Sequence, residues 1–366
     1  MKRRNFISNI ALSATTATVV SACQQSIDAP NVQADSLPNI QWNMVTSWPT
    51  SLDTIYGGAL TISERVEAMT GGKFKIKPYA AGEIVPGLEV LDAVQNGTAQ
   101  CGHSASYYYI GKNPSLAFAT TMPFGLTAQQ QNAWLYHGGG LEMMQKVYSD
   151  FNIINFPAGN TGAQMGGWFK REISTLNDLK GLKMRIPGLG GKVMAKLGVN
   201  VQVLPGGEIF FALDRGAIDA AEFSGPYDDE KLGLNKAANF YYYPGWWEPG
   251  PTLDFLVNKS EWDKLPQQYQ EILISAAKEA NVNMLSKYEV LNKQSLKTLV
   301  DGGTQLKAYS QEILKEAQKA STQILEDTAK DDATFKEIYD QWSKFREEIT
   351  QWNKINELSY NDFVSR

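Results

Sequence analysis

The sequence contains one unit that occurs once in each half of the chain, and this repeat limits the folds open to it. Residues 89–100 (EVLDAVQNGTAQ) and 208–219 (EIFFALDRGAID) share one pattern, in which a short helix ends at a glycine and a strand follows. Upstream of the second copy, further elements are predicted at 151–156, 188–197 and 199–204. A helix, a glycine and a strand also form a common unit that recurs by coincidence, but a match of this extent favours two related lobes.

The order of elements around the first copy predicts the fold class. Residues 40–47 alternate like a strand, 51–70 carry an apolar stripe typical of a helix, and 73–79 alternate again before a helix at 88–95. This β-α-β-α order indicates an α/β fold with helices on the faces of a sheet. Two such lobes imply a ligand cleft between them, because open sheets of this kind bind ligands outside the carboxyl ends of their strands.

The chain is long enough for two domains and is predicted to divide where composition and periodicity change. The predicted segments are an export signal at 1–22, a flexible tether at 23–39, a first lobe at 40–155 completed by about 251–300, a second lobe at 156–250, and C-terminal helices at 301–366. The last helices carry one apolar face from Phe335 to Trp352, in steps of three and four residues. This face packs either on the chain's own lobes or on a second subunit.

The first 23 residues have the features of a bacterial export signal. A basic start at Lys2, Arg3 and Arg4 precedes an apolar stretch far shorter than the ~20 residues that a bilayer span requires. The closing VSAC resembles a lipobox, in which Cys23 receives lipid and becomes the mature amino terminus. The opening RRNFI resembles the twin-arginine export pattern, and an ordinary signal with a chance pair of arginines is the alternative. We therefore expect a periplasmic protein that meets the membrane through a lipid anchor.

The charge balance and the scarcity of cysteine and histidine exclude several classes of function. With 34 basic against 39 acidic residues, the formal net charge of −5 offers no basic field for nucleic acid. Two cysteines and two histidines rule out most zinc-site patterns. If Cys23 carries lipid, Cys101 has no disulfide partner, and its small neighbours favour a packed, inert thiol over a reactive one.

An arginine on a short apolar strand is the first candidate ligand-binding residue. Arg185 lies between Met184 and Ile186, and the Pro-Gly pair that follows ends the strand. At a strand end, a guanidinium is well placed to hold a carboxylate through two hydrogen bonds. A surface arginine on an edge strand is the alternative.

A loop rich in glycine and amide side chains is the second candidate. Residues 158–169 (AGNTGAQMGGWF) expose backbone and offer Asn160 and Gln164 as polar ligands. The loop lacks the Lys-Ser/Thr pair of a phosphate-binding loop, so nucleotide binding is not expected. A tight crossover between lobes is the alternative interpretation.

The repeat also places two strand ends opposite one another across the predicted cleft, at 103–108 and 222–227. The tyrosines at 107–109 are either pocket wall or packed aromatics, and we expect at least one of them to be wall. The acidic cluster at 228–230 precedes a Lys-Leu pair and is typical of the first turn of a helix, which we favour over a metal site.

Four stretches of the sequence resemble one family of transport proteins. GNTGAQMGGWF, LKMRIPG, DAAEFSGPYDDEKLGL and YYYPGWWEPG are similar to the solute-binding subunits of tripartite ATP-independent periplasmic (TRAP) transporters, in the branch that binds 2-oxo acids and lactate. The likeness covers residues 40–366. It implies a two-lobe periplasmic binding protein, type II-like, that closes on a small organic acid and delivers it to a membrane permease driven by a sodium gradient. The resemblance also implies a homodimer, joined by the terminal helices, as one arrangement of the C-terminal region.

The resemblance further implies roles for particular residues. Arg185 matches the arginine that clamps the ligand carboxylate. Gln164, Glu222 and the backbone carbonyl of Phe223 match the ligands of a metal ion that bridges ligand and protein. Glu248 falls where a further oxygen ligand is expected. An all-oxygen set suits a hard cation; two carboxylates favour Ca²⁺, whereas Na⁺ is equally suitable if Glu248 points away.

A small 2-oxo or 2-hydroxy monocarboxylate, such as pyruvate, lactate or a longer 2-oxo acid, has the groups that such a site requires. One carboxylate oxygen would meet Arg185, while the other and the oxygen on C2 chelate the metal. Asn160 is a further candidate contact. Trp48, Tyr108 and Trp247 are expected to bound the pocket and limit the ligand's tail.

Two other classes of function share parts of this pattern. A sensory module that reports ligand occupancy to a membrane receptor would have the same pocket. An exported enzyme acting on organic acids would need a general base or nucleophile in the cleft, but no Ser/His/Asp arrangement is visible, and His103 and His137 lie in ordinary contexts. We therefore expect a binding protein rather than an enzyme.

Overall fold

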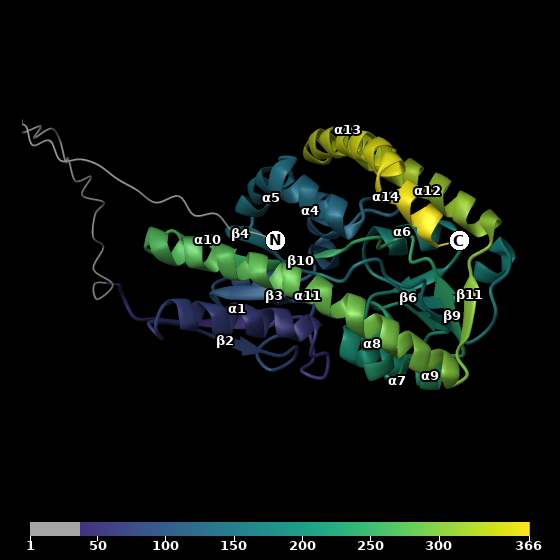
Figure 1. The fold of residues 1–366 in the computed structure, drawn as a ribbon, viewed down its shortest axis with the longest axis horizontal. Coiled ribbons are helices and arrows are strands. Elements are labelled where there is room, and N and C mark those ends of the chain that lie inside the picture. The colour runs from purple at the N-terminus through teal and green to yellow at the C-terminus, as the bar shows by residue number, and fades with distance from the viewer. Residues whose placement is uncertain (1–36, 366) are drawn as a thin grey trace, which may run out of the picture. The chain divides into compact units, whose positions relative to one another are not determined.

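The computed structural model describes residues 37–365. The predicted export signal, the predicted lipidation site Cys23 and all but the end of the predicted tether lie outside the described residues. Within the described part, no helix is both long and apolar enough to cross a membrane. Two sheets organise the fold, and Figure 1 shows the long helix α11 running past both.

The first sheet has five strands in the order β2-β1-β3-β10-β4. Its strands are β1 (Ile40–Thr46), β2 (Phe74–Tyr79), β3 (Cys101–Ser104), β4 (Ile153–Asn160) and β10 (Thr252–Asn258). Strand β1 pairs in parallel with β2 and β3, whereas β10 runs antiparallel between β3 and β4. The helical segments between these strands are α1 (Ile55–Met69), α2 (Val90–Gln95), η2 (Ser106–Tyr109), η3 (Pro114–Leu116), α3 (Ala117–Thr120), α4 (Ala128–His137) and α5 (Gly140–Ser149).

The second sheet has six strands in the order β11-β9-β5-β8-β6-β7. Its strands are β5 (Trp168–Phe169), β6 (Lys183–Arg185), β7 (Asn200–Gln202), β8 (Ala220–Ala221), β9 (Phe240–Tyr243) and β11 (Gln305–Ala308). Strand β6 pairs in parallel with β7 and β8, and β5 runs antiparallel to β8 and β9. Its helical segments are η4 (Leu176–Leu179), α6 (Gly188–Lys196), η5 (Gly206–Glu208), α7 (Ile209–Asp214), α8 (Pro226–Lys231) and α9 (Leu234–Ala237).

Both sheets contain the same three-strand core, which confirms the predicted repeat. Strand β1 lies between β2 and β3 in the first sheet, and β6 lies between β7 and β8 in the second. Each repeated helix is followed by a glycine with positive φ, Gly97 (75°) and Gly216 (76°), a conformation that favours glycine because it has no Cβ. The strand predicted at 151–156 is β4 of the first sheet, so its assignment to the second copy was wrong. An apolar run predicts a strand but not its sheet, and β4 pairs with β10.

The C-terminal part of the chain is mostly helical, as predicted, except that β11 lies within the segment predicted as helices and joins the second sheet by pairing with β9. Its helices are α10 (Lys259–Trp262), α11 (Gln267–Asp301), α12 (Gln311–Asp331), α13 (Ala333–Ile355) and α14 (Glu357–Val364). The start of α13 packs on the chain itself, since the rings of Phe335 and Trp342 lie 4.9 and 5.9 Å from the ring of Phe118. Trp352, nearer the end of α13, is 57% exposed. Phe345 and Ile349 are partly buried against the same core, so the predicted apolar face is covered along most of its length and is open only at its end.

A buried carboxyl group connects three elements around the first sheet. Asp254 of β10 accepts a hydrogen bond from Asn155 Nδ2 of β4 at 2.8 Å, and its other oxygen is bonded to the Ser106 hydroxyl of η2. Burial raises the pKa of Asp254 to about 7, although both hydrogen bonds act to lower it.

This carboxyl group predicts a dependence of stability on pH. The unfolded chain releases this proton from about pH 4, whereas the folded protein keeps it up to about pH 7, so native stability falls as the pH rises from about 4 to about 7 and then levels off. Asp254→Asn keeps a neutral side chain of similar shape. We expect its stability relative to wild type to increase between pH 4 and pH 8 by on the order of 2 kcal/mol in urea unfolding. A difference that stays constant across this range would contradict the assignment.

Candidate functional site

Arg185 and Glu222 are brought together by two neighbouring parallel strands. Arg185 ends β6 and pairs with Ala221 of β8, and Glu222 directly follows β8. The Arg185 Nη1 donates to the carboxylate of Glu222 and to its backbone oxygen, the latter at 2.7 Å. The Nε donates to the Leu204 carbonyl at 3.0 Å. Both side chains are completely buried, and β6 is an interior strand, so the alternative of a surface arginine on an edge strand is excluded.

A second carboxylate, Glu248, shares this buried environment. It is 3% exposed. Burial raises the pKa of Glu222 to about 7, although the charge of Arg185 acts to lower it. Burial and then the charge of Glu222 hold the pKa of Glu248 well above its usual range. One guanidinium thus faces two carboxyl groups, and both carboxyl groups would ionise more readily next to a further positive charge.

The glycine- and amide-rich loop lies next to Glu248. The backbone N–H of Gln164 donates to the Glu248 carbonyl at 3.1 Å, and the N–H of Gly245 donates to the Gln164 carbonyl at 3.0 Å. A Cβ at Gly245 would lie 2.5 Å from that carbonyl oxygen, so glycine is required for this close approach. The side-chain nitrogen of Gln164 donates to Thr161 Oγ1 at 3.1 Å. The loop is thereby fixed against the segment that carries Glu248.

Several polar atoms of this cluster are buried without a hydrogen-bond partner. Buried polar groups are nearly always paired in native proteins, so unpaired atoms gathered in one place indicate a site for a bound group. The unpaired atoms are Gln164 Oε1, Arg185 Nη2, Glu222 Oε2, Trp247 Nε1 and Glu248 Oε2. Three of them are oxygens, which suit a hard cation, and one is a guanidinium donor, which suits an anion.

The donor set limits which metals fit. Among residues 37–365 there is no group of three or more His, Cys, Asp and Glu side chains arranged to hold a metal ion. A cation here would therefore depend on amide or backbone oxygens as well as carboxylates. Phe223, which follows Glu222, is buried, and its ring lies 5.7 Å from the Arg185 guanidinium carbon.

Asn160 is buried beside this cluster, but its amide is already in use. Its Nδ2 donates to the Gly250 carbonyl at 3.1 Å and to Thr252 Oγ1 at 3.3 Å. Its Oδ1 accepts from the backbone N–H of Gly162 at 2.8 Å. Both Nδ2 hydrogens are therefore used within the protein, and only the second lone pair of Oδ1 is left for a ligand. The structure thus gives this residue a role in shaping the loop.

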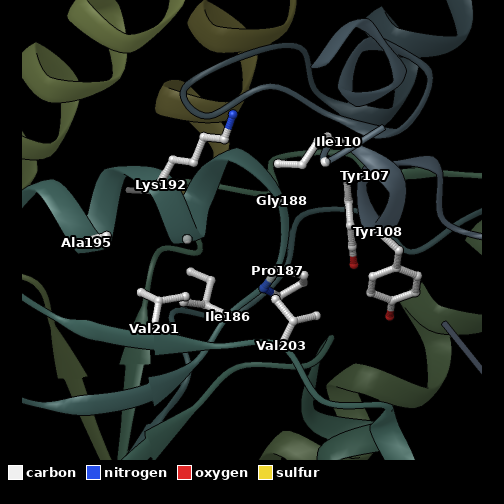
Figure 2. Close-up of a pocket in the computed structure, with 12 residues that line it drawn as sticks. Tyr107, Tyr108, Ile110, Ile186, Pro187, Gly188, Lys192, Ala195, Val201 and Val203 are labelled. Atoms are coloured by element: carbon white, nitrogen blue, oxygen red, sulfur yellow. The ribbon is translucent and has the colours of Figure 1, made fainter. Parts of the chain in front are cut away.

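Aromatic residues from the first half of the fold lie against the second half. A pocket of about 330 Å³ has Tyr107 and Tyr108 of η2 on one side and Ile186, Pro187 and Val203 on the other (Figure 2). Both tyrosines line this pocket, but the buried cluster around Arg185 and Glu222 does not, so a tyrosine wall for the ligand site stays a prediction. Sequence reasoning did not single out the aliphatic side of this pocket, because its residues are ordinary members of apolar runs.

Trp48 and Trp247, the two tryptophans predicted to bound the ligand pocket, are both buried. The Trp48 Nε1 donates to His103 Nδ1 at 2.8 Å, and the Trp48 ring lies 6.2 Å from the ring of Tyr108. Trp247 packs against Trp246 with ring centroids 4.8 Å apart. Its indole N–H is one of the unpaired donors described above.

The acidic cluster begins a helix, as predicted, but it is not solvent-exposed. Asp228 and Asp229 lie in the first turn of α8 and are almost completely buried. Asp229 accepts hydrogen bonds from Trp168 Nε1 at 2.9 Å and from the Tyr241 hydroxyl at 2.7 Å. It also accepts from the backbone N–H of Ser224 at 3.2 Å. Asp229 therefore anchors α8 to β5 and β9 and fixes the segment that follows Glu222, a role that no local sequence pattern signals.

Comparison with known proteins identifies the class to which this fold and site correspond. Residues 44–332 match the DctP family, described as bacterial extracellular solute-binding protein, family 7. A monocarboxylate 2-oxoacid-binding periplasmic protein of Nostoc sp. (strain PCC 7120) is 64% identical over 365 residues, covering 100% of this chain and 99% of the relative. The chain belongs to this family of solute-binding proteins and has the two-lobe periplasmic binding fold.

Two solved structures of TRAP solute-binding proteins are similar along most of the chain. One, from Bordetella bronchiseptica RB50, has 45% identity and a TM-score of 0.88, covers 89% of this chain and 97% of its own, and is a mixed-occupancy dimer with copurified calcium and picolinate. The other, from Pseudoalteromonas atlantica T6c, has 37% identity and a TM-score of 0.86, covers 88% and 99%, and contains bound sodium and pyruvate.

Proposed function

We propose that this protein binds a small 2-oxo or 2-hydroxy monocarboxylate in the periplasm, together with one bridging cation, and delivers it to the permease subunits of a TRAP transporter. The observation that carries the proposal is the buried cluster of unpaired polar atoms on Gln164, Arg185, Glu222 and Glu248. The names of the similar proteins, which include a 2-oxoacid-binding protein and a complex with pyruvate, support the ligand class. The predicted signal and lipid anchor at Cys23 would place the protein at the periplasmic face of a membrane.

Each residue of the cluster has a distinct role in this proposal. The Nη1 and Nε of Arg185 are bonded within the protein, which leaves Nη2 as the donor for the ligand carboxylate. Gln164 Oε1, the two carboxylates and the Phe223 carbonyl would hold the cation. When bound, the cation supplies positive charge and a second anchor for the ligand's oxygens. The neighbouring aromatic residues keep water away from these charges and strengthen their interactions.

The charges favour calcium over sodium. Arg185 contributes one positive charge, whereas Glu222, Glu248 and the bound acid contribute three negative ones when ionised. A divalent ion neutralises this set, and a monovalent ion leaves one negative charge buried, which is costly in a low-dielectric site. Because Glu248 is buried with an unpaired oxygen, we propose Ca²⁺ as the preferred ion and Na⁺ as the second.

Isothermal titration calorimetry with pyruvate, lactate and longer 2-oxo acids tests the proposal. Each acid is titrated in buffer with calcium, with sodium only, and with chelator in a sodium-free buffer. We expect binding with calcium and at least tenfold weaker binding with chelator. Failure of every acid to bind in all three buffers would overturn the ligand class, and equal affinity in all three would overturn the bridging cation.

The second class of function, an exported enzyme, has less support. His103 is completely buried, its Nδ1 accepts from Trp48 Nε1, and its Nε2 donates to the Ala158 carbonyl. Burial lowers its pKa to about 4. Both ring nitrogens of this histidine are used in hydrogen bonds within the protein, so neither is accessible to a substrate in the cleft as a general base.

We propose a homodimer that uses the end of the C-terminal region. In the single chain, the C-terminal end of α13 and the whole of α14 expose a set of apolar side chains. Such a set is more typical of a protein–protein interface than of a solvent-exposed surface. These residues are Trp352, Ile355, Leu358, Tyr360, Phe363 and Val364. The dimeric state of the Bordetella structure supports a second copy as the partner.

Truncation after residue 351 tests this interface. Because the removed segment is mostly exposed while Phe335, Ile338 and Trp342 stay buried, we expect the shortened chain to fold and to sediment as a monomer. The measurement is sedimentation velocity at several protein concentrations, with the full mature chain sedimenting as a dimer. A full chain that remains monomeric at all concentrations would contradict the proposal.

A further inference from the structure

One exposed aspartate holds together elements from both halves of the fold. Asp53 lies in the segment between β1 and α1, and its carboxylate accepts hydrogen bonds from the Tyr227 hydroxyl at 3.0 and 3.2 Å. The Lys231 Nζ also donates to this carboxylate. The Lys287 Nζ lies 3.6 Å from it and donates to the Asp53 carbonyl at 3.2 Å. Three side chains thus converge on a single carboxylate.

Two of the three partners of Asp53 come from the opposite half of the site. Tyr227 and Lys231 belong to α8, which Asp229 anchors to β5 and β9 of the second sheet. Lys287 belongs to α11, which contacts α1 of the first half and α8 of the second. Asp53 itself follows β1 of the first sheet. In Figure 1, α11 runs alongside α1 and continues past α8, and it contacts both helices.

The two segments joined by Asp53 also carry walls of the binding site. Trp48, a predicted pocket residue, precedes Asp53 in the same loop. Helix α8 begins at Pro226, shortly after Glu222 and Phe223. A movement that separates the two halves would therefore break the Asp53 contacts as it opens the site.

We propose that Asp53 is a positioning residue for ligand binding, which holds the two lobes closed over the bound acid through Tyr227 and Lys231, while Lys287 of α11 supports the carboxylate from its own side. This inference rests on the proposed function, because it concerns closure of the same site. Asp53 contacts neither the ligand-binding arginine nor the carboxylate pair in the described structure. Its effect is on the equilibrium between open and closed lobes.

The expected effect is moderate because the contacts are partly exposed. The side chains of Asp53, Lys231 and Lys287 are 47%, 32% and 45% exposed, and isolated exposed ion pairs contribute little. Two donors and a further lysine charge near one carboxylate form a network, so we expect Asp53→Asn to weaken ligand affinity by about threefold to tenfold. The contacts form only on closure, so the loss appears as faster dissociation rather than slower association.

The test measures pyruvate binding to the full mature chain in the presence of calcium by stopped-flow fluorescence. The variants are Asp53→Asn, Lys231→Met and the double variant, and the matched control is Asp263→Asn. Asp263 follows α10 and is 56% exposed. In the described structure its ion pair is with Lys259 of α10 at 2.7 Å, so this pair does not connect the two halves. Small-angle X-ray scattering of each protein, with and without pyruvate, reports the separation of the lobes.

Support for the proposal is a faster dissociation rate in both single variants, no further change in the double variant, and an unchanged rate in the Asp263→Asn control. A surface network that serves stability alone would lower the unfolding midpoint but leave the dissociation rate unchanged, and that result overturns the proposal. If the wild-type protein binds no 2-oxo acid, the proposed function fails separately. The scattering of the unliganded proteins then decides the role of Asp53, and equal radii of gyration in wild type and Asp53→Asn overturn it.

Discussion

Replacing Arg185 by methionine is expected to lower the affinity for pyruvate by a factor of about 100 or more. The change removes the unpaired Nη2 donor and the positive charge in a fully buried site, where a charge-assisted hydrogen bond contributes about 3 kcal/mol. Arg185→Lys restores the charge without the planar fork, so its affinity should lie between the two. Calorimetry with pyruvate and calcium provides the measurement.

The fold should survive the loss of Arg185. Burial already raises the pKa of Glu222 to about 7, and Arg185 is the group that acts most strongly to lower it. Without Arg185, Glu222 takes up a proton at neutral pH and no isolated charge is left buried. The control is Arg171→Met, because Arg171 is exposed and bonds only to the Asp178 carbonyl at 2.9 Å in the described structure. Retained affinity in Arg185→Met would remove Arg185 from the binding site.

Replacing Glu222 by glutamine is expected to remove the response of the protein to calcium. Glutamine keeps an oxygen that can accept from Arg185 Nη1, but it takes away one of the two negative charges proposed to hold the cation. We expect calcium affinity to fall by a factor of about 100, since each carboxylate ligand contributes strongly to a site of this kind. Pyruvate affinity of the variant should then be the same with calcium and with chelator.

Calcium titration followed by tryptophan fluorescence, with pyruvate present and absent, measures this effect. Glu230→Gln is the matched control, because Glu230 is a glutamate eight residues further along the chain and has no place in the proposed cation site. Its calcium response should match that of wild type. A Glu222→Gln variant that still binds calcium with wild-type affinity would show that the cation lies elsewhere.

Several features of the site were predictable because they depend on local sequence. The position of Arg185 at the end of a short strand follows from an apolar triplet before Pro-Gly, and the structure has β6 ending there. The loop that carries Gln164 follows from its glycines and amides. The acidic first turn at Asp228 follows from the preference of helix starts for negative charge.

Other features depend on contacts between distant segments and left no local signal. The pairing of Arg185 with Glu222 requires β6 and β8 to be neighbours, which is a consequence of strand order. The burial of Asp229 depends on Trp168 and Tyr241 from two other strands. The sequence also did not indicate that the amide of Asn160 would be used by Thr252 and Gly250.

The sequence by itself determined the α/β class, the repeated helix-glycine-strand unit and the loops that supply the candidate ligands, because these depend on periodicity and on the conformations that glycine and proline impose. Only the tertiary structure decided the order of the strands, in which β10 runs antiparallel between β3 and β4. The tertiary structure alone also showed which carboxyl groups are buried away from solvent. It showed as well which ion pairs, such as that of Asp53 with Lys231, connect the two halves of the fold. Strand order and desolvation are properties of the whole packed chain, and no local pattern encodes them.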